Sequence, residues 1–457
     1  MLKHEKNRII FALSNVCRSW RHHITGCKYL FRDIAFDASS EESIVTAGVF
    51  LKMLEGTGAP ISVYANLRQP SRPNPMVTRL FARLRPHIPH IVHFEYNGDM
   101  AEYRLHLDHP APNLLFFSDG FDARPGSGLP LFRGHMPGLR VLTTLSPASQ
   151  VVWTTSTLLD LTILNLGFLG MGPSVHLGPL LDLLRGSPRL ESVIILCFAP
   201  VVNPNEALPD VFLPRLHTLG LQHNEFHTVL KHLRIPNVRE VFFHGESHPV
   251  SGEELNPTFK APHLFAGFPL LPIFEQPIEN LRLETTADGR TYAKFCIRLT
   301  ADGGFVLRVS LYWVLDAVPL FKDYLKHSVT WLARMVSLTP QAHVELFLAH
   351  EAPLDTLTYQ PFLLVADIGD LTIRGGFAVD VLNKLTTRTG SQHLLPHLKL
   401  LNIMDRVQFS DEEGKGALLA CLRSRVAGPV RLSVRLMCTE VPCMDSSGLG
   451  YVFKREF

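Results

Sequence analysis

Three histidines with a spacing of three, His87, His90 and His93, are the strongest candidates for metal ligands in the sequence. On a helix, side chains three apart are neighbours, and imidazoles so placed can share one zinc ion. Pro86 and Pro89 interrupt this segment, however, and it runs directly into a pattern typical of a buried strand. The histidines are therefore interpreted as structural or solvated residues, and no metal site is predicted.

The seven cysteines are scattered along the chain and have no disulfide-framework spacing. Cys438 and Cys443 have four residues between them rather than the two that suit a zinc knuckle, and no second pair stands nearby. Reduced structural thiols in the cytoplasm or the nucleus are the expectation.

Other signatures of catalysis fail on their spacing. Gly167, Gly170 and Gly172 reverse the glycine spacing of a dinucleotide fingerprint and run into Pro173, while Lys415 lacks the upstream glycine of a phosphate-binding loop. The sequence contains neither a Gly-x-Ser-x-Gly nucleophile elbow nor a His-Glu-x-x-His motif. The sequence thus predicts no enzyme and no cofactor. A cytosolic α/β enzyme whose carboxylates meet only in space stays open as an alternative.

Composition argues for a soluble, interaction-type protein. The 457 residues include 44 basic and 42 acidic side chains, a net charge of +2, so nucleic acid and anionic membrane are not expected partners. The apolar run after the N-terminal lysines is too short for a signal peptide, and no run is long and apolar enough to cross a bilayer.

A pattern of apolar-x-x-apolar-x-apolar residues recurs along the chain and predicts a series of buried strands. It occurs at Ile91/Phe94/Tyr96, Leu158/Leu161/Ile163, Leu190/Val193/Ile195, Leu216/Leu219/Leu221, Val238/Val241/Phe243, Ile278/Leu281/Leu283, Ile368/Leu371/Ile373 and Leu398/Leu401/Ile403. The unit from Leu216 to Asn224 matches a leucine-rich-repeat opening in full, and the starts at 190, 216 and 238 have the spacing of such repeats. An ordinary α/β protein with leucine-rich strands is the alternative interpretation.

Segments between these strands have the 3.6-residue period of helices that cover a sheet. Apolar residues fall at i, i+3, i+4 and i+7 in three of them, and a further amphipathic helix is expected from Phe321 to Val336. The three are Val77/Leu80/Phe81/Leu84, Phe226/Val229/Leu230/Leu233 and Ala378/Val381/Leu382/Leu385.

Residues 247–277 break the rhythm, since six prolines exclude long regular elements there. Two alternating strand patterns follow, 295–299 and 305–313, joined by the turn sequence Ala-Asp-Gly-Gly at 301–304. The segment 285–314 is predicted to be an antiparallel meander, either inserted between repeats or continuing their sheet.

The N-terminal segment predicts one amphipathic helix, because its apolar residues share a helical face. They are Ile9, Leu13, Val16, Cys17, Trp20 and Ile24. On periodicity alone this is a helix docked on the rest of the protein.

The order of residues in this segment adds a family resemblance. Val16-Cys17-Arg18, then Trp20, then Tyr29-Leu30-Phe31 and Ile34 resemble the second half of an F-box, whose first half has no counterpart here. Residues 49–65 resemble the segment that follows the box in fungal F-box proteins of the mushroom type. There a helix ends in a small-residue turn, here Gly56 to Pro60, and an apolar-Ser-Val strand follows. Residues 110–116 and 137–142 are similar to repeat openings of that family.

The resemblance implies a substrate-recruiting subunit of a Skp-cullin-F-box ubiquitin ligase. The Skp-type adaptor would be held through Val16, Cys17, Trp20, Leu30 and Phe31, with Arg18 at the rim, and a target protein would bind the repeat region. A leucine-rich-repeat interaction scaffold with a non-docking N-terminus is the alternative.

The implied fold is an irregular α/β solenoid of leucine-rich-repeat type, with a curved parallel sheet and outer helices, preceded by a small helical partial F-box. The expected organisation is a partial F-box at 1–36, a connecting segment at 37–84, repeats at 85–246, the proline-rich segment and meander at 247–318, and further repeats at 319–457. The loops after strands, at 222–224 and 374–376, are the candidate target contacts.

Overall fold

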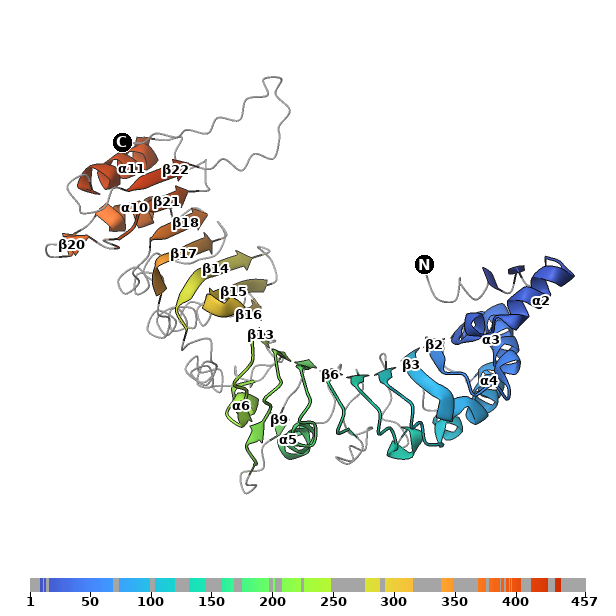
Figure 1. Ribbon diagram of the computed structural model, residues 1–457. Coiled ribbons are helices and arrows are strands. Elements are labelled where there is room, and N and C mark those ends of the chain that lie inside the picture. Colours follow the sequence, from blue (N-terminus) through green and yellow to red (C-terminus); the bar gives the residue numbers. More distant parts are fainter. Residues whose placement is uncertain are drawn as a thin grey trace. The chain divides into compact units, whose positions relative to one another are not determined.

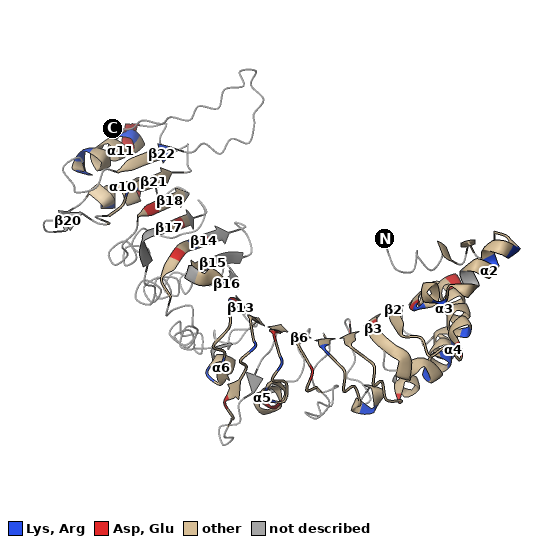
Figure 2. Ribbon diagram, in the orientation of Figure 1, with Lys and Arg blue, Asp and Glu red and all other residues tan. Residues whose placement is uncertain are grey.

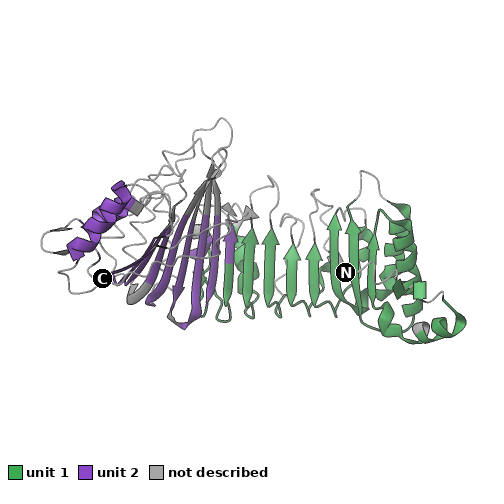
Figure 3. Cartoon of the chain, turned by 90° about the horizontal axis from the view of Figure 1, so that it is seen from above, with its two compact units in different colours: residues 1–219, 232–237 green, residues 220–231, 238–457 purple. Residues whose placement is uncertain are grey.

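The computed structural model describes two compact α/β units, residues 1–219 with 232–237, and residues 220–231 with 238–457 (Figure 3). Its main sheet is mostly parallel and, over the described residues, does not close into a barrel. The described residues are 9–10, 12–13, 16–68, 74–98, 103–119, 131–144, 158–167, 175–196, 200–201, 208–222, 226–247, 276–287, 292–314, 338–348, 369–374, 378–386, 388–389, 392–393, 395, 397–403, 412–425 and 432–436.

The first unit is built on parallel strands that pair in the order of the sequence (Figure 1). Each strand pairs in parallel with the next, as a sheet does when every connection passes over one face. The strands are β1 (Asp33–Asp37), β2 (Ile61–Leu67), β3 (Ile91–Gly98), β4 (Phe116–Asp119), β5 (Val141–Thr144), β6 (Ile163–Gly167) and β8 (Ser192–Leu196), and the division between the units falls in β11 (Thr218–Gln222).

Helices α3 (Glu41–Leu54) and α4 (Pro75–Leu84) connect the first strands. The Ser40 side chain caps α3 by accepting a hydrogen bond from the Ser43 N–H, and Gly56 follows the helix with a φ of 70°. The predicted face of α4 is confirmed, since Val77, Leu80, Phe81 and Leu84 are all buried. The alternation predicted for β2 is confirmed as well. Shorter connections are η2 (Arg85–His90), η3 (Arg104–Leu107), η4 (Leu131–Gly134) and α5 (Leu177–Arg185).

A repeated turn precedes most strands of the first unit. In each turn a backbone N–H donates to the carbonyl three residues earlier, and the residues at both ends are buried. The next two N–H groups usually share the carbonyl of the residue just before the preceding strand, as Arg140 and Val141 share that of Leu115. The turns in this unit run from Ala111 to Leu114, Met136 to Leu139, Leu158 to Leu161, Ser187 to Leu190 and Leu213 to Leu216.

This turn corrects one predicted register. Leu158, Leu161 and Ile163 were expected to form a strand unit, but Leu158 and Leu161 are the two ends of the turn. The buried strand residues are Leu164 and Leu166, and Ile163 is only half-buried. The same apolar pattern also fits three residues later, from Leu161 to Leu166. The turn hydrogen bond shows that this later register is the one in the structure.

The predicted N-terminal helix is also shorter than its periodicity suggests. Residues 9–10 and 12–13 are helical, Val16 and Cys17 are not, and α2 begins at Arg18 and ends at Gly26. The turn η1 (Lys28–Phe31) then leads into β1. The segment is therefore two short helical pieces rather than one continuous face.

The second unit contains the predicted meander. Strands β14 (Ile278–Ala287), β15 (Tyr292–Ala301) and β16 (Phe305–Val314) are antiparallel, and Gly303 and Gly304 turn the last two with φ of 77° and 80°. The meander continues the sheet rather than standing apart, because β16 pairs in parallel with β13 (Glu240–Ser247) and β14 with β17 (Leu338–Leu348). The sheet then continues through β18 (Asp370–Arg374), β21 (Leu400–Ile403) and β22 (Ser433–Leu436).

Two helices pack together in this unit, α10 (Ala378–Thr386) and α11 (Glu412–Arg425). The face predicted for α10 is confirmed, since Val381, Leu382 and Leu385 are buried.

The helix predicted from Phe226 is wrong in extent: α6 ends at Leu230, and Leu233 begins β12 (Leu233–Arg234), which pairs with β10 (Val211–Phe212). The remaining short pairs are β7 (Val175–His176) with β9 (Pro200–Val201) and β19 (Arg388–Thr389) with β20 (Gln392–His393).

Several predictions fall on residues outside the described ranges. They are the helix from Phe321 to Val336, most of the proline-rich segment 247–277, and the loop residues 223–224 and 375–376. None of the helices in the described ranges is long and apolar enough to cross a membrane.

Candidate binding surfaces

Exposed apolar side chains gather at the start of the chain. Of the eleven large hydrophobic residues that are exposed over the described ranges, five lie between residues 9 and 29. These five form what is here called the N-terminal surface: Ile9, Leu13, Val16, Trp20 and Tyr29. Water-exposed apolar side chains are common singly, so five of them in one short segment make this segment a candidate binding surface.

The most exposed of these side chains belong to the family-like motif. Val16 is 65% exposed, Trp20 51% and Tyr29 62%, and Cys17 is exposed beside them. A half-exposed tryptophan is an effective anchor for a partner, since its large ring buries much area and loses little conformational freedom.

Basic residues accompany the N-terminal surface. Helix α2 has the sequence Arg-Ser-Trp-Arg-His-His-Ile-Thr-Gly, without an acidic residue, and Arg18 and Arg21 are exposed. Figure 2 shows basic ribbon segments on α2 at the end of the first unit. A partner for this surface would combine an apolar pocket with nearby carboxylates.

Of the predicted contact residues, Phe31 is buried and Leu30 is half-buried. Phe31 is only 1% exposed and lies against Phe50 of α3, with ring centroids 4.9 Å apart. Leu30 is half-buried, and its N–H donates to the Cys27 carbonyl at 2.9 Å. In this conformation Phe31 fixes η1 to α3.

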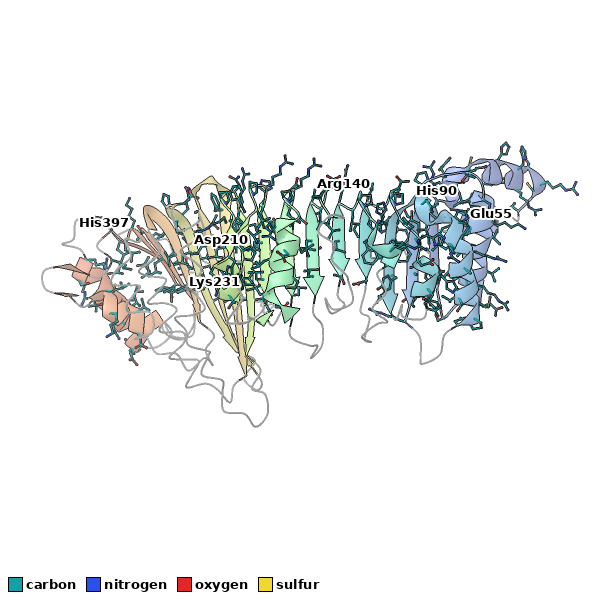
Figure 4. All side chains as sticks on the ribbon, turned by 90° about the horizontal axis from the view of Figure 1, so that it is seen from below. Glu55, His90, Arg140, Asp210, Lys231 and His397 are labelled. Atoms are coloured by element: carbon teal, nitrogen blue, oxygen red, sulfur yellow. The ribbon has the colours of Figure 1, made fainter. Side chains whose placement is uncertain are left out.

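A second candidate surface lies on the face of the first unit's sheet whose side chains are only half-buried. His93 stacks on Phe116 with ring centroids 4.0 Å apart and also contacts Tyr64, from the two strands beside β3. The His93 ring lies 3.4 Å from the Glu95 carboxylate. Half-exposed Val141 and Ile163 continue this apolar row across β5 and β6. Figure 4 shows Arg140 and His90 at the edge where these strands begin.

The three histidines considered as metal ligands are not gathered on one helix. His87 and His90 lie in η2, and His93 lies in β3. Burial lowers the pKa of His87, a residue that is only 7% exposed, so its ring is held in the neutral form. Within the described part of the chain no group of three His, Cys, Asp or Glu residues could hold a metal ion.

The other sequence candidates are dispersed. Gly167 ends β6, while Gly170, Gly172, Cys438 and Cys443 lie outside the described residues. Lys415 lies in α11 and pairs with Glu412 at 3.1 Å.

A third candidate surface lies on the sheet of the second unit. It is polar, and the sequence did not predict it. His343 of β17 contacts Glu345 at 3.1 Å and Asp370 of β18 at 3.2 Å. Arg282 of β14 reaches Glu345 at 3.6 Å, so these groups form one network across three strands. Figure 2 shows acidic ribbon segments on β14 and β18. Only strand pairing, which the sequence does not state, brings the network together.

Comparisons of this chain with models of protein families, with curated proteins and with solved structures found no match.

Proposed function

We propose that this protein is a substrate-recruiting subunit of a Skp-cullin-F-box ubiquitin ligase that acts in the cytoplasm or the nucleus. The N-terminal surface docks on the Skp-type adaptor, and the sheet presents a target protein to the ligase. The protein itself performs no bond chemistry in this role. The sheet and its repeated turns then form an irregular solenoid of leucine-rich-repeat type.

The observation that carries the proposal is the exposure of Val16, Trp20 and Tyr29, the same residues that give the N-terminal segment its resemblance to the second half of an F-box. Leaving these side chains in water is unfavourable, by about 25 cal/mol for each Å² of apolar area. A partner that covers them would recover that free energy. Arg18 then lies at the edge of the contact, where a carboxylate of the adaptor can reach it.

The repeated turn supports the second half of the proposal. Each turn and its strand contact mainly the neighbouring strand, which is the arrangement that lets repeat proteins present a broad surface to a partner. Side-chain hydrogen bonds also join neighbouring turns. The amide of Asn113 donates to the Pro89 carbonyl at 2.8 Å, and that of Asn237 donates to the Pro214 carbonyl at 2.7 Å.

Co-purification with the Skp adaptor tests the proposal directly. The unmodified chain is expected to bind the adaptor stoichiometrically, and the double substitution Val16→Ala with Trp20→Ala is expected to weaken binding by at least tenfold. The matched control is Leu105→Ala with Leu159→Ala, which removes equally exposed apolar side chains, 65% and 56%, far along the chain. Equal binding by both double variants, or no binding by the unmodified chain, would refute the adaptor role.

One observation favours the second candidate function, an interaction scaffold that does not dock on the adaptor. Phe31 is buried against Phe50, so one of the six residues implied by the resemblance is not available to a partner. In that case the N-terminal surface would not bind the adaptor, whereas partner binding on the sheet would be unchanged.

A further inference from the structure

Three arginines of the second unit stand directly opposite one another on adjacent strands. Arg308 of β16 is paired in register with Arg298 of β15, and Arg298 is paired in register with Arg282 of β14. Residues in direct register on antiparallel strands share a face and are close neighbours. These three residues are named the arginine row, and Figure 1 shows their strands side by side.

The two outer arginines have partners on this face. Arg308 lies 3.8 Å from Glu240 and 5.2 Å above the ring of Phe242. Arg282 contacts Glu284 at 3.0 Å and Glu345 at 3.6 Å.

The central arginine differs from both. Arg298 is exposed and, among the described residues, forms no ion pair with a carboxylate. Like charges placed directly opposite one another on neighbouring strands are destabilising, and Arg298 faces such a neighbour on each side. Its guanidinium is therefore accessible to a carboxylate of another molecule.

We propose that the arginine row binds an acidic segment of a partner protein, with a carboxylate of that segment held by Arg298. This inference deepens the proposed function and rests on it, since it states what kind of target the sheet would recruit. The guanidinium of arginine matches a carboxylate with two parallel hydrogen bonds, which lysine cannot offer.

The row suits a single carboxylate. Strands lie about 4.8 Å apart, so the strands of Arg308 and Arg282 lie at about that distance on either side of the strand of Arg298. Successive side chains of an extended peptide point to opposite sides. One carboxylate can therefore meet Arg298 while the adjoining residues of the peptide point away from the row, and the outer arginines keep their glutamate partners.

The surroundings favour a protein over nucleic acid. Glu240, Glu284 and Glu345 flank the row, and Asp370 lies beyond them. A continuous line of phosphates would be repelled by these carboxylates, whereas a peptide can place a neutral or basic residue next to each of them.

Fluorescence anisotropy with synthetic peptides tests the inference on the full chain. The probe is a short labelled peptide with one glutamate between neutral residues, and its control carries glutamine at that position. The unmodified protein is expected to bind the glutamate peptide, more weakly as salt is raised, and to bind the glutamine peptide at least tenfold more weakly. Arg298→Gln is expected to weaken glutamate-peptide binding about tenfold.

Two controls separate binding from structural damage. Arg423→Gln removes an exposed arginine of α11 in the same unit and should leave peptide binding unchanged. The thermal midpoint of Arg298→Gln should equal or exceed that of the unmodified protein, because a like-charge contact is removed. A lowered midpoint would mean that Arg298 is structural and would overturn the inference.

Further results would also overturn it: no saturable binding of the glutamate peptide, equal losses in Arg298→Gln and Arg423→Gln, or equally tight binding of a single-stranded oligonucleotide. The variant Val16→Ala with Trp20→Ala should bind the glutamate peptide normally. If adaptor binding fails while peptide binding holds, the proposed function fails and the arginine row stands as an acidic-segment site. If only peptide binding fails, the inference alone fails.

Discussion

Phe31 and Phe50 meet edge to face with ring centroids 4.9 Å apart, and this pair joins the N-terminal segment to the body of the first unit. Both rings are 1% exposed. The contact places η1 against α3 and leaves Tyr29, two residues before Phe31, on the surface at 62% exposure. The turn η1 therefore buries Phe31 in the first unit and leaves Tyr29 exposed to solvent.

Phe31→Ala should lower the free energy of unfolding by about 3–5 kcal/mol, because it leaves a cavity against Phe50. Tyr29→Ala in the same turn should change it by less than about 0.5 kcal/mol, because that ring is in water. Urea unfolding followed by circular dichroism measures both. Equal effects of the two substitutions would mean that η1 does not pack as described.

Gly98→Ala should destabilise the first unit by at least about 2 kcal/mol. Gly98 ends β3 with a φ of 118°, and an added Cβ would lie 2.5 Å from the backbone carbon of Leu67. Because the obstructing atoms are backbone, they cannot move aside cheaply. Gly26→Ala is the matched control, since its Cβ would have no atom within 4 Å. Differential scanning calorimetry of both variants should show a lower midpoint for Gly98→Ala alone.

The stability of the first unit should fall as the pH drops below about 6.5, the ordinary pKa of histidine. Burial lowers the pKa of His87 in the folded protein, so the unfolded chain takes up a proton at a pH where the folded chain does not. The unfolded state is thereby favoured from pH 6.5 down to the lowered pKa. His87→Gln should flatten this dependence in urea unfolding at pH 7.5, 6 and 5, whereas His135→Gln, at an exposed position, should not. A dependence unchanged by His87→Gln would contradict the assignment.

Native-state alkylation should distinguish two cysteines. Cys17 is exposed and should react with iodoacetamide readily, while Cys421 is fully buried in α11. Burial raises the pKa of the Cys421 thiol, although the guanidinium of Arg425 opposes this, so little thiolate forms. Peptide mass spectrometry should find Cys421 modified only after unfolding. Adaptor added before the reagent should protect Cys17, and its failure to do so would argue against contact there.

Local patterns in the sequence were sufficient for several elements of the fold. The helix α4, the alternation of β2 and the meander of β14, β15 and β16 each depend on residues close together in the chain, and their periods and turn residues indicate them directly. The sequence could not determine the register of a strand where the apolar pattern fits at two positions. Leu161 fits either the first strand position or the end of the turn, and only its hydrogen bond to the Leu158 carbonyl decides.

The candidate site was predicted in part for the same reason. The apolar residues of the N-terminal surface were identified from their order, but periodicity could not show that the helix breaks at Val16 and Cys17. Nor could periodicity show that Phe31 packs against Phe50, because that contact joins residues of two different elements, η1 and α3. The arginine row was missed altogether. The turn at 302–304 fixes Arg298 opposite Arg308, but the place of Arg282 depends on the pairing of a third strand.

The glycine turn between β15 and β16 has a consequence for the order in which the second unit folds. These two strands meet through a connection of three residues, whereas each parallel neighbour must wait for a long stretch of chain to close. Short loops close at a lower entropic cost, and hairpins form within microseconds. We therefore expect this hairpin to form before β13 and β17 join the sheet, with the pair of Arg298 and Arg308 at its centre among the first contacts within the second unit.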